Sequence, residues 1–212
     1  MSDFRALIES VIKGDRNRAT TETQNALDGG NKVKDILDNG LIAAMDQVSE
    51  RYSKGLMFVP QMLRSAKTMQ ECMKLLEPFF KEGDVTSKGK VLIGTVKGDL
   101  HDIGKNLVAM MMGGAGFAIT DLGVDIPPEE FVQKAREVEP DIVAMSALLS
   151  TTMPAMLQTI EALQKAGIRD KVKVMIGGAP VTEKYAQEIK ADSYASDAGS
   201  AVSKAKKLLG IS

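Results

Sequence analysis

The sequence has no tryptophan, one cysteine and one histidine among its 212 residues. The single cysteine, Cys72, excludes an internal disulfide framework and is typical of a protein from a reducing cytoplasm. No apolar run approaches the length of a membrane span, and the first residues do not form a signal peptide. The net charge of −1 gives no reason to expect nucleic acid or an anionic membrane as a partner. These absences favour a globular cytoplasmic protein.

Residues 1–84 carry only helical signals. Apolar residues recur at helical spacing from Phe4 to Ile12 and from Met62 to Leu76, with Pro60 at the start of the second stretch. Between these stretches, Asn39-Gly40 punctuates a further helical pattern. Short connections between roughly four helices predict a small bundle, either a scaffold, a dimer surface or a functional cap.

Strand and helix patterns alternate after a polar connector at residues 78–89, which predicts two domains, 1–84 and 90–212. Strands are expected at 90–96, 117–122, 141–146, 172–177 and 192–196, and helices at about 103–113, 128–138, 152–167, 181–190 and 197–210. This alternation predicts an α/β fold with a doubly wound parallel five-stranded sheet. In the flavodoxin-like strand order, the loops after the first and third strands are neighbours at the carboxyl edge, where ligands bind.

The only histidine, His101, lies on the expected turn between the first strand and the first helix, with Asp99 and Asp102 beside it. A histidine on such a loop is more often an ordinary surface residue than a ligand. Here Asp99 can hold one ring nitrogen and aim the other outward, as is common for metal-bound imidazole. His101 is therefore a candidate metal ligand.

Two nucleotide-binding motifs fail on spacing in this region. Five residues separate Gly98 from Gly104 where a phosphate loop has four, and Asn106 replaces the hydroxyl residue that would bind Mg²⁺. No G-x-G-x-x-G follows the strand, so a dinucleotide site has no support.

Two more loops at the same edge carry candidate binding groups. The loop after the third strand holds four hydroxyl residues, Ser146, Ser150, Thr151 and Thr152; the ordinary interpretation is that Ser150 or Thr151 caps the next helix. The fourth strand ends in Gly177-Gly178, which permits a close approach of the backbone to a bulky group. Together the three loops predict a site for a large cofactor.

Three motifs in order resemble the cobalamin-binding signature of the B12-binding fold: Asp99-x-His101-x-x-Gly104, Ser146-x-Leu148 and Gly177-Gly178. The intervals between them are 41 and 28 residues, which is the spacing of that family. In the helical half, Tyr52-x-x-Gly55-x-x-Phe58-Val59-Pro60-Gln61 resembles the cap domain that precedes this fold in methionine synthase. The small corrinoid proteins of methanogens, acetogens and related anaerobes have the same layout.

The resemblance implies cobalamin, as methylcobalamin or cob(I)alamin, or a related corrinoid as cofactor. It implies that His101 is the lower cobalt ligand in place of dimethylbenzimidazole, that is, base-off and His-on binding. Tyr52 and Val59 would cap the methyl-bearing face, and no catalytic residue of the chain's own is implied. The residues implied in cofactor binding are Asp99, His101, Asp102, Ile103, Gly104, Ser146, Leu148, Ser150, Thr152, Gly177, Gly178, Ala179, Tyr194 and Ala198.

The function that the resemblance implies is a methyl carrier, a corrinoid subunit of a multi-component methyltransferase system and not a complete enzyme. Its expected partners are a substrate-specific methyltransferase, an acceptor methyltransferase (for example of tetrahydrofolate) and a reductive activase, and it could also form a homodimer. Two alternatives stay open: a cobalamin-based sensor, which would need a DNA-binding domain, and the cobalamin subunit of a radical mutase, which would need a catalytic barrel. The methyl donor, whether methanol, a methylamine, glycine betaine or an aryl ether, is left open.

Overall fold

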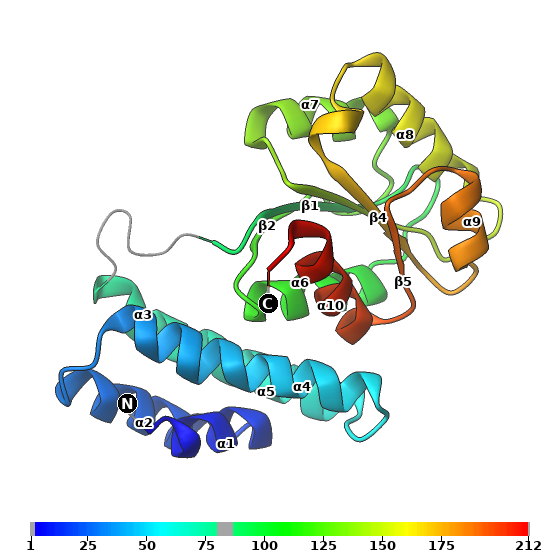
Figure 1. Cartoon of the computed structure of the whole chain (residues 1–212). Coiled ribbons are helices and arrows are strands. Elements are labelled where there is room, and N and C mark those ends of the chain that lie inside the picture. The colour runs from blue at the N-terminus through cyan, green and yellow to red at the C-terminus, as the bar shows by residue number, and fades with distance from the viewer. Residues whose placement is uncertain (1–2, 80–86, 212) are drawn as a thin grey trace. The chain divides into compact units, whose positions relative to one another are not determined.

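The computed structural model describes residues 3–79 and 87–211 (Figure 1). The chain divides into a helical unit, Met1–Thr86 with Gly114–Gly116, and a sheet-containing unit, Ser87–Gly113 with Phe117–Ser212. The connector predicted at residues 78–89 lies largely outside the described residues. Within the described part of the chain, no helix is both long and apolar enough to cross a membrane.

The helical unit is a bundle of helices joined by short connections. Its elements are α1 (Arg5–Lys13), α2 (Arg16–Asp28), α3 (Val33–Ile36), a π-helical segment (Leu37–Ile42), α4 (Ala43–Ser53), α5 (Val59–Leu76) and a 3-10 turn (Glu77–Phe79). The Asp15 side chain caps α2 by accepting a hydrogen bond from the Arg18 N–H. The buried Ser65 hydroxyl of α5 donates to the Ile12 carbonyl of α1 at 2.9 Å, so these two helices are joined by a polar bond as well as by packing.

The sequence signal at Asn39-Gly40 does not end the helix, but it coincides with a π-helical segment between α3 and α4. The chain passes through a single π-helical stretch and continues into α4. A Cβ atom built on Gly40 would lie 2.8 Å from Leu7 Cδ2, so the glycine lets α1 pack closely at this point.

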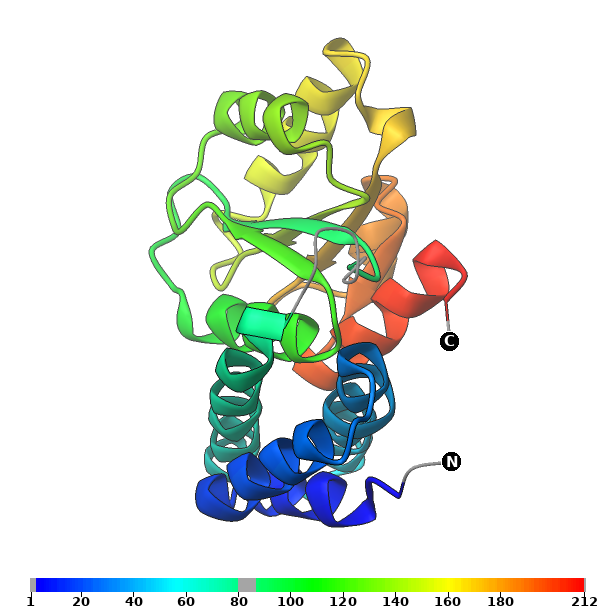
Figure 2. The ribbon, with the colours of Figure 1, turned by 90° about the vertical axis from the view of Figure 1, so that its left-hand side faces the viewer.

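The second unit contains a parallel sheet in the order β2-β1-β3-β4-β5, which confirms the flavodoxin-like topology. The strands are β1 (Lys90–Thr95), β2 (Ala118–Asp121), β3 (Ile142–Ser146), β4 (Lys173–Gly177) and β5 (Ser193–Ala195). The helices are α6 (Ile103–Gly114), α7 (Pro128–Val138), α8 (Pro154–Lys165), α9 (Glu183–Glu188) and α10 (Ala198–Leu209), with a 3-10 turn at Arg169–Lys171. Helices α7 and α8 cover one face of the sheet and α6 and α10 the other (Figures 1 and 2).

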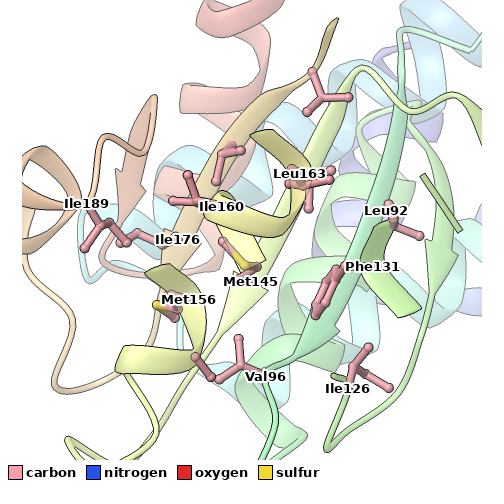
Figure 3. Close-up of a cluster of buried hydrophobic side chains, with 14 of the residues drawn as sticks. Leu92, Val96, Ile126, Phe131, Met145, Met156, Ile160, Leu163, Ile176 and Ile189 are labelled. Atoms are coloured by element: carbon pink, nitrogen blue, oxygen red, sulfur yellow. The ribbon is translucent and has the colours of Figure 1, made fainter. Parts of the chain in front are cut away.

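The core on the α7–α9 side of the sheet holds large apolar side chains from the strands and from these helices (Figure 3). Phe131 of α7 is fully buried there, and a Cβ on Gly94 of β1 would come within 2.9 Å of its ring. The lack of a side chain at Gly94 therefore makes room for the Phe131 ring on the sheet. This packed layer gives the loops at the end of the strands a rigid base.

The strand register sets four of these loops side by side. Thr95 pairs with Ser146, Ser146 with Gly177, and Gly177 with Ala195. The carboxyl ends of β1, β3, β4 and β5 are thus level with one another. The loop that carries His101 emerges beside the loop after β3.

Candidate functional site

His101 is held from its backbone and from its ring. Its Nδ1 lies 2.7 Å from Oδ1 of Asp99, and its backbone N–H donates to the same oxygen at 3.1 Å. The buried Thr95 hydroxyl, at the end of β1, donates to the His101 carbonyl at 2.9 Å. The strand end and the aspartate together fix where the ring lies.

Asp99 is fully buried and joins two loops. Its second oxygen, Oδ2, accepts bonds from the Leu148 N–H at 2.7 Å, the Leu149 N–H at 3.3 Å and the Thr152 hydroxyl at 2.7 Å. Burial by itself raises the pKa of this carboxyl, but the bonds from Thr152, Leu148 and His101 outweigh it and hold the pKa well below its usual range. Asp99 is therefore a carboxylate that acts as an acceptor on both oxygens.

The Asp99 carboxylate determines the tautomer of the His101 ring. A carboxylate at 2.7 Å requires a proton on Nδ1, so the neutral ring carries its lone pair on Nε2. The His101 side chain is 50% exposed, and Nε2 has no hydrogen-bond partner among residues 3–79 and 87–211. The site presents one outward-facing imidazole nitrogen in a fixed tautomer.

An apolar surface surrounds this nitrogen donor. Leu100 is 72% exposed and Ile103 is 82% exposed, while Leu148 and Leu149 are each 43% exposed. Leu100, Leu148 and Leu149 lie in the two loops that Asp99 joins, and Ile103 is the first residue of α6. Exposed apolar side chains gathered at one place are typical of a surface that a ligand covers.

The paired glycines serve the approach of neighbouring loops to one another. A Cβ on Gly178, whose φ is +128°, would lie 1.9 Å from the Ala147 carbonyl oxygen, and a Cβ on Gly177 would lie 2.9 Å from the Ala195 carbonyl oxygen. Each glycine thus faces the backbone of a neighbouring residue, Ala147 after β3 or Ala195 in β5, with which a side chain would collide.

Helix α8 shows which hydroxyl has a structural task. It begins at Pro154 without a side-chain cap, so the interpretation that Ser150 or Thr151 caps it is wrong. Thr152 instead turns inward, is 8% exposed and donates to Asp99. Pro154 has no N–H, and the Ala155 and Met156 N–H groups donate to the Thr152 and Met153 carbonyls at 3.0 and 2.9 Å, so the first turn of α8 needs no side-chain cap.

The remaining predicted residues are distributed over the same edge, with different exposures. Asp102 is exposed and accepts a bond from the Asn106 amide at 3.0 Å, and a Cβ on Gly104 would meet no atom within 4 Å. Ser150 and Ala179 are exposed, Ser146 is half-buried, Tyr194 packs against the core on the α7–α9 side, and Ala198 is 2% exposed.

In the helical unit, Tyr52 of α4 is half-buried and Val59, the first residue of α5, is 37% exposed. Between them, Leu56 and Phe58 are 73% and 71% exposed. Leu56 is not among the predicted site residues; its place beside Gly55, in the turn before α5, is the signal that indicates an exposed apolar side chain. The Leu148 and Leu149 N–H groups were missed for another reason: a backbone donor has no sequence signature.

A cavity of about 490 Å³ opens at the opposite end of the sheet, beside the start of β4 and the end of α9. Its lining contains none of the predicted site residues. No group of three or more His, Cys, Asp or Glu side chains that could hold a metal ion occurs in the ranges 3–79 and 87–211.

Comparison with known proteins decides the family. Residues 89–203 match the family model described as B12 binding domain, and residues 4–77 match a second model with the same description. The chain belongs to the family of B12-binding corrinoid proteins. Trimethylamine corrinoid protein 1 of Methanosarcina acetivorans is 41% identical over 203 residues, which cover 95% of this chain and 94% of that protein. Dimethylamine corrinoid protein 1 of Methanosarcina mazei is 45% identical over 176 residues, 82% of each chain.

Solved structures agree with this assignment. A cobalamin-binding protein from Desulfitobacterium hafniense superposes with a TM-score of 0.84 at 29% identity, over 98% of this corrinoid protein and 99% of that chain. The methanol:cobalamin methyltransferase complex of Methanosarcina barkeri superposes with a TM-score of 0.87 at 26% identity, over 98% of this chain and 79% of that chain. The cofactor of the family is a corrinoid, and the resemblance drawn from the three motifs is confirmed.

The donor set fits a corrinoid. A corrin would bring its own nitrogen ligands for cobalt, so a single neutral imidazole from the protein would be enough to hold the metal. Nε2 of His101 is such a donor, oriented by Asp99 as metal-bound histidines commonly are by a carboxylate. The exposed Leu100, Ile103 and Leu148 offer apolar contacts to a large ring at the same place.

Proposed function

We propose that this protein binds a corrinoid base-off with His101 as the lower cobalt ligand and carries methyl groups between two methyltransferases. The observation that supports this most directly is the 2.7 Å bond between His101 Nδ1 and the buried Asp99, which leaves Nε2 as the free donor. When bound, the corrin supplies cobalt, on which a methyl group is carried. The chain itself binds the corrinoid, orients His101 and shields the methyl-bearing face.

Each part of the site has a role in this proposal. Asp99 keeps the proton on Nδ1 of His101, and Thr152 keeps Asp99 in place from the other side. Because Asp99 accepts five bonds on its two oxygens, its position is set by two loops, and its bond to Nδ1 then fixes the orientation of the His101 ring. The proposed ligand is thus pre-organised before the cofactor arrives.

The helical unit is proposed to shield the methyl-bearing face, with Tyr52 and Val59 as the residues closest to it. The support is the match of Tyr52 to Gln61 with the cap of methionine synthase, together with the exposure of Leu56 and Phe58 in the same turn. Apolar side chains that remain exposed in this turn would exclude water from a reactive face. The domain limits proposed for the two functions are 1–84 and 90–212.

The methyl donor is proposed to be a methylamine. The relatives at 41% and 45% identity are a trimethylamine and a dimethylamine corrinoid protein, whereas the chain from the methanol-specific complex is 26% identical. The partners proposed are a methylamine-specific methyltransferase, an acceptor methyltransferase and a reductive activase, all in the cytoplasm, and the bundle could serve a homodimer.

The test is a transfer experiment with each donor. The protein is loaded with cobalamin, reduced, and mixed with carbon-labelled trimethylamine, dimethylamine or methanol and the methyltransferase specific for that donor. Gel filtration then separates the protein, and the label bound to it is counted. We expect label from a methylamine, less from methanol, and a strongly reduced yield in His101→Gly. A protein that binds cobalamin but takes label from no donor would contradict the carrier function.

A further inference from the structure

Leu100 and His101 have little packing to hold them. They are 72% and 50% exposed, so the position of the loop that carries them has to come from hydrogen bonds at its backbone. The loop also contains Gly98 at φ +82°, a conformation that only glycine adopts at no steric cost. A segment of this kind needs an external support to present one ring in one orientation.

The support comes from Asp125, on the loop between β2 and α7. Its side-chain Oδ1 accepts the Gly98 N–H at 2.7 Å, and its own backbone N–H donates to the Asp99 carbonyl at 3.0 Å. These two bonds hold the peptide groups on either side of the Gly98–Asp99 pair. The carboxylate that orients His101 is therefore fixed through its backbone by a residue on another loop.

Asp125 is itself rigidly placed. The next residue, Ile126, is 5% exposed, donates its N–H to the Thr95 carbonyl at 3.0 Å and forms a parallel bridge with Val96. Gly123, on the other side, accepts a bond from the Thr95 N–H at 2.9 Å. Asp125 has φ +58°, a left-handed conformation in which aspartate is one of the few residues found regularly.

The far side of the His101 segment is held from the end of β2. Lys105, in the first turns of α6, is 2% exposed and forms an ion pair with Asp121, at the end of β2. Asp121 in turn accepts the Gly123 N–H at 2.9 Å. The segment from Gly98 to Lys105 is thus held at one end by Asp125, in the loop after β2, and at the other by Asp121, the last residue of β2.

From this geometry we propose that Asp125 is a positioning residue that keeps the Asp99–His101 pair in the arrangement needed for cobalt ligation; the inference rests on the proposed function of His101. Asp125 is exposed and fills no part of the core. Its loss should therefore change the His101 ring more than the fold. Hydrogen-bond strength falls with misalignment, so a shifted Asp99 would bind Nδ1–H less well.

Three variants test this. Asp125→Gly keeps the left-handed backbone and its N–H but removes the acceptor for Gly98. Asp125→Asn keeps an oxygen acceptor in a conformation that asparagine tolerates. Glu139→Gly, at φ +48° after α7, is the matched control, because it introduces glycine at a left-handed position remote from His101.

The readout uses the only histidine in the chain. Nitrogen-15 NMR of tag-free apoprotein labelled on histidine reports the tautomer of His101 alone, at a pH where the ring is neutral. The second readout is the spin-resonance spectrum of the cobalt(II) holoprotein, which reports the fraction with imidazole bound. Neither depends on methyl transfer.

We expect Asp125→Gly to lower the ratio of the Nδ1–H tautomer to the other tautomer by about threefold to tenfold, less than the loss caused by removing a direct partner of a metal ligand. The bound imidazole fraction of the holoprotein should fall in parallel. Asp125→Asn should stay near the wild type, as should Glu139→Gly. If Asp125→Gly matches Glu139→Gly in both spectra, or if Asp125→Asn fails as Asp125→Gly does, the positioning role is overturned and the proposed function stands. A wild-type holoprotein without imidazole on cobalt overturns the proposed function, and the positioning role with it.

Discussion

Replacing Asp99 with asparagine is the sharpest perturbation of the site. The carboxyl accepts five bonds and donates none, and the side chain is fully buried. An asparagine has one acceptor and one NH₂ donor, so its NH₂ group must face donors on one of the two sides. Toward Leu148 and Leu149 it would meet two backbone N–H groups, which cannot become acceptors.

Toward His101 the NH₂ group meets one backbone N–H and one ring nitrogen, and the ring can adapt. If the proton moves from Nδ1 to Nε2, Nδ1 becomes an acceptor for the amide. We therefore expect Asp99→Asn to place its nitrogen toward His101 and to convert the ring to the Nε2–H tautomer. That tautomer has no lone pair on Nε2 for cobalt. Because a hydrogen bond to a charged group contributes about 1.5–3 kcal/mol, the tautomer ratio should shift by about tenfold or more.

Stability should fall as well. The partly buried backbone N–H of His101 loses its acceptor, at about 1–3 kcal/mol, and the bonds at the other oxygen lose their charge. We expect the free energy of unfolding of the apoprotein to drop by about 2–4 kcal/mol in urea titrations, without loss of the fold. Asp141→Asn is the control, since Asp141 also accepts a backbone N–H, that of Lys90 at 2.7 Å, but on the opposite edge of the sheet.

The assay is nitrogen-15 NMR of the single histidine in apoprotein, followed by titration with cobalamin. A shift to the Nε2–H tautomer together with weaker His-on binding supports the reasoning. An Asp99→Asn protein with the wild-type tautomer and the wild-type cobalt spectrum would refute it.

Three further outcomes follow from the same contacts. Gly178→Ala should lower the unfolding free energy of the apoprotein by about 3 kcal/mol or more in urea titrations, because its Cβ would overlap the Ala147 carbonyl oxygen. Gly104→Ala, with open space around its Cβ, should leave that free energy unchanged or slightly higher. Folding lowers the pKa of Asp99, so the stability that this carboxylate contributes is fully present above its unfolded pKa of about 3.9 and is lost as the pH falls through the lower folded pKa. In urea titrations, the advantage of the wild type over Asp99→Asn should therefore hold down to about pH 5 and shrink below about pH 4. Val59→Ala and Tyr52→Ala should change cobalamin affinity by less than about 1 kcal/mol yet speed photolysis of the bound cofactor. The control is Leu157→Ala on α8, which truncates a residue as exposed as Val59 and should leave photolysis unchanged. Equal photolysis in all three variants would argue against a cap.

The sheet was predictable because each strand is a short buried apolar run between turn residues, and all five observed strands fall within the expected ranges. The juxtaposition of His101 and Thr152 followed from topology, since the loops after β1 and β3 are neighbours whenever the order is β2-β1-β3. Residue type alone could not show which of the three hydroxyl residues would turn toward Asp99. That it is Thr152, rather than Ser150 or Thr151, depends on the conformation of the turn before Pro154.

Two other features lay outside sequence reasoning. The grip of Asp125 on Gly98 depends on a backbone conformation at φ +58°, which no periodicity reveals. Sequence alone could not show which group Gly178 approaches, because a glycine pair signals close approach without saying to what. The structure identifies the Ala147 carbonyl as the neighbouring group.

The most direct test of the account is the spin-resonance spectrum of the cobalt(II) protein, prepared with histidine labelled with nitrogen-15 and with unlabelled cobalamin. Since His101 is the only histidine, any change in nitrogen splitting on labelling comes from that residue. If His101 is the cobalt ligand, the splitting changes with the isotope in the histidine and disappears in His101→Gly. A splitting that does not respond to the label, as expected from the benzimidazole of the cofactor, would contradict it.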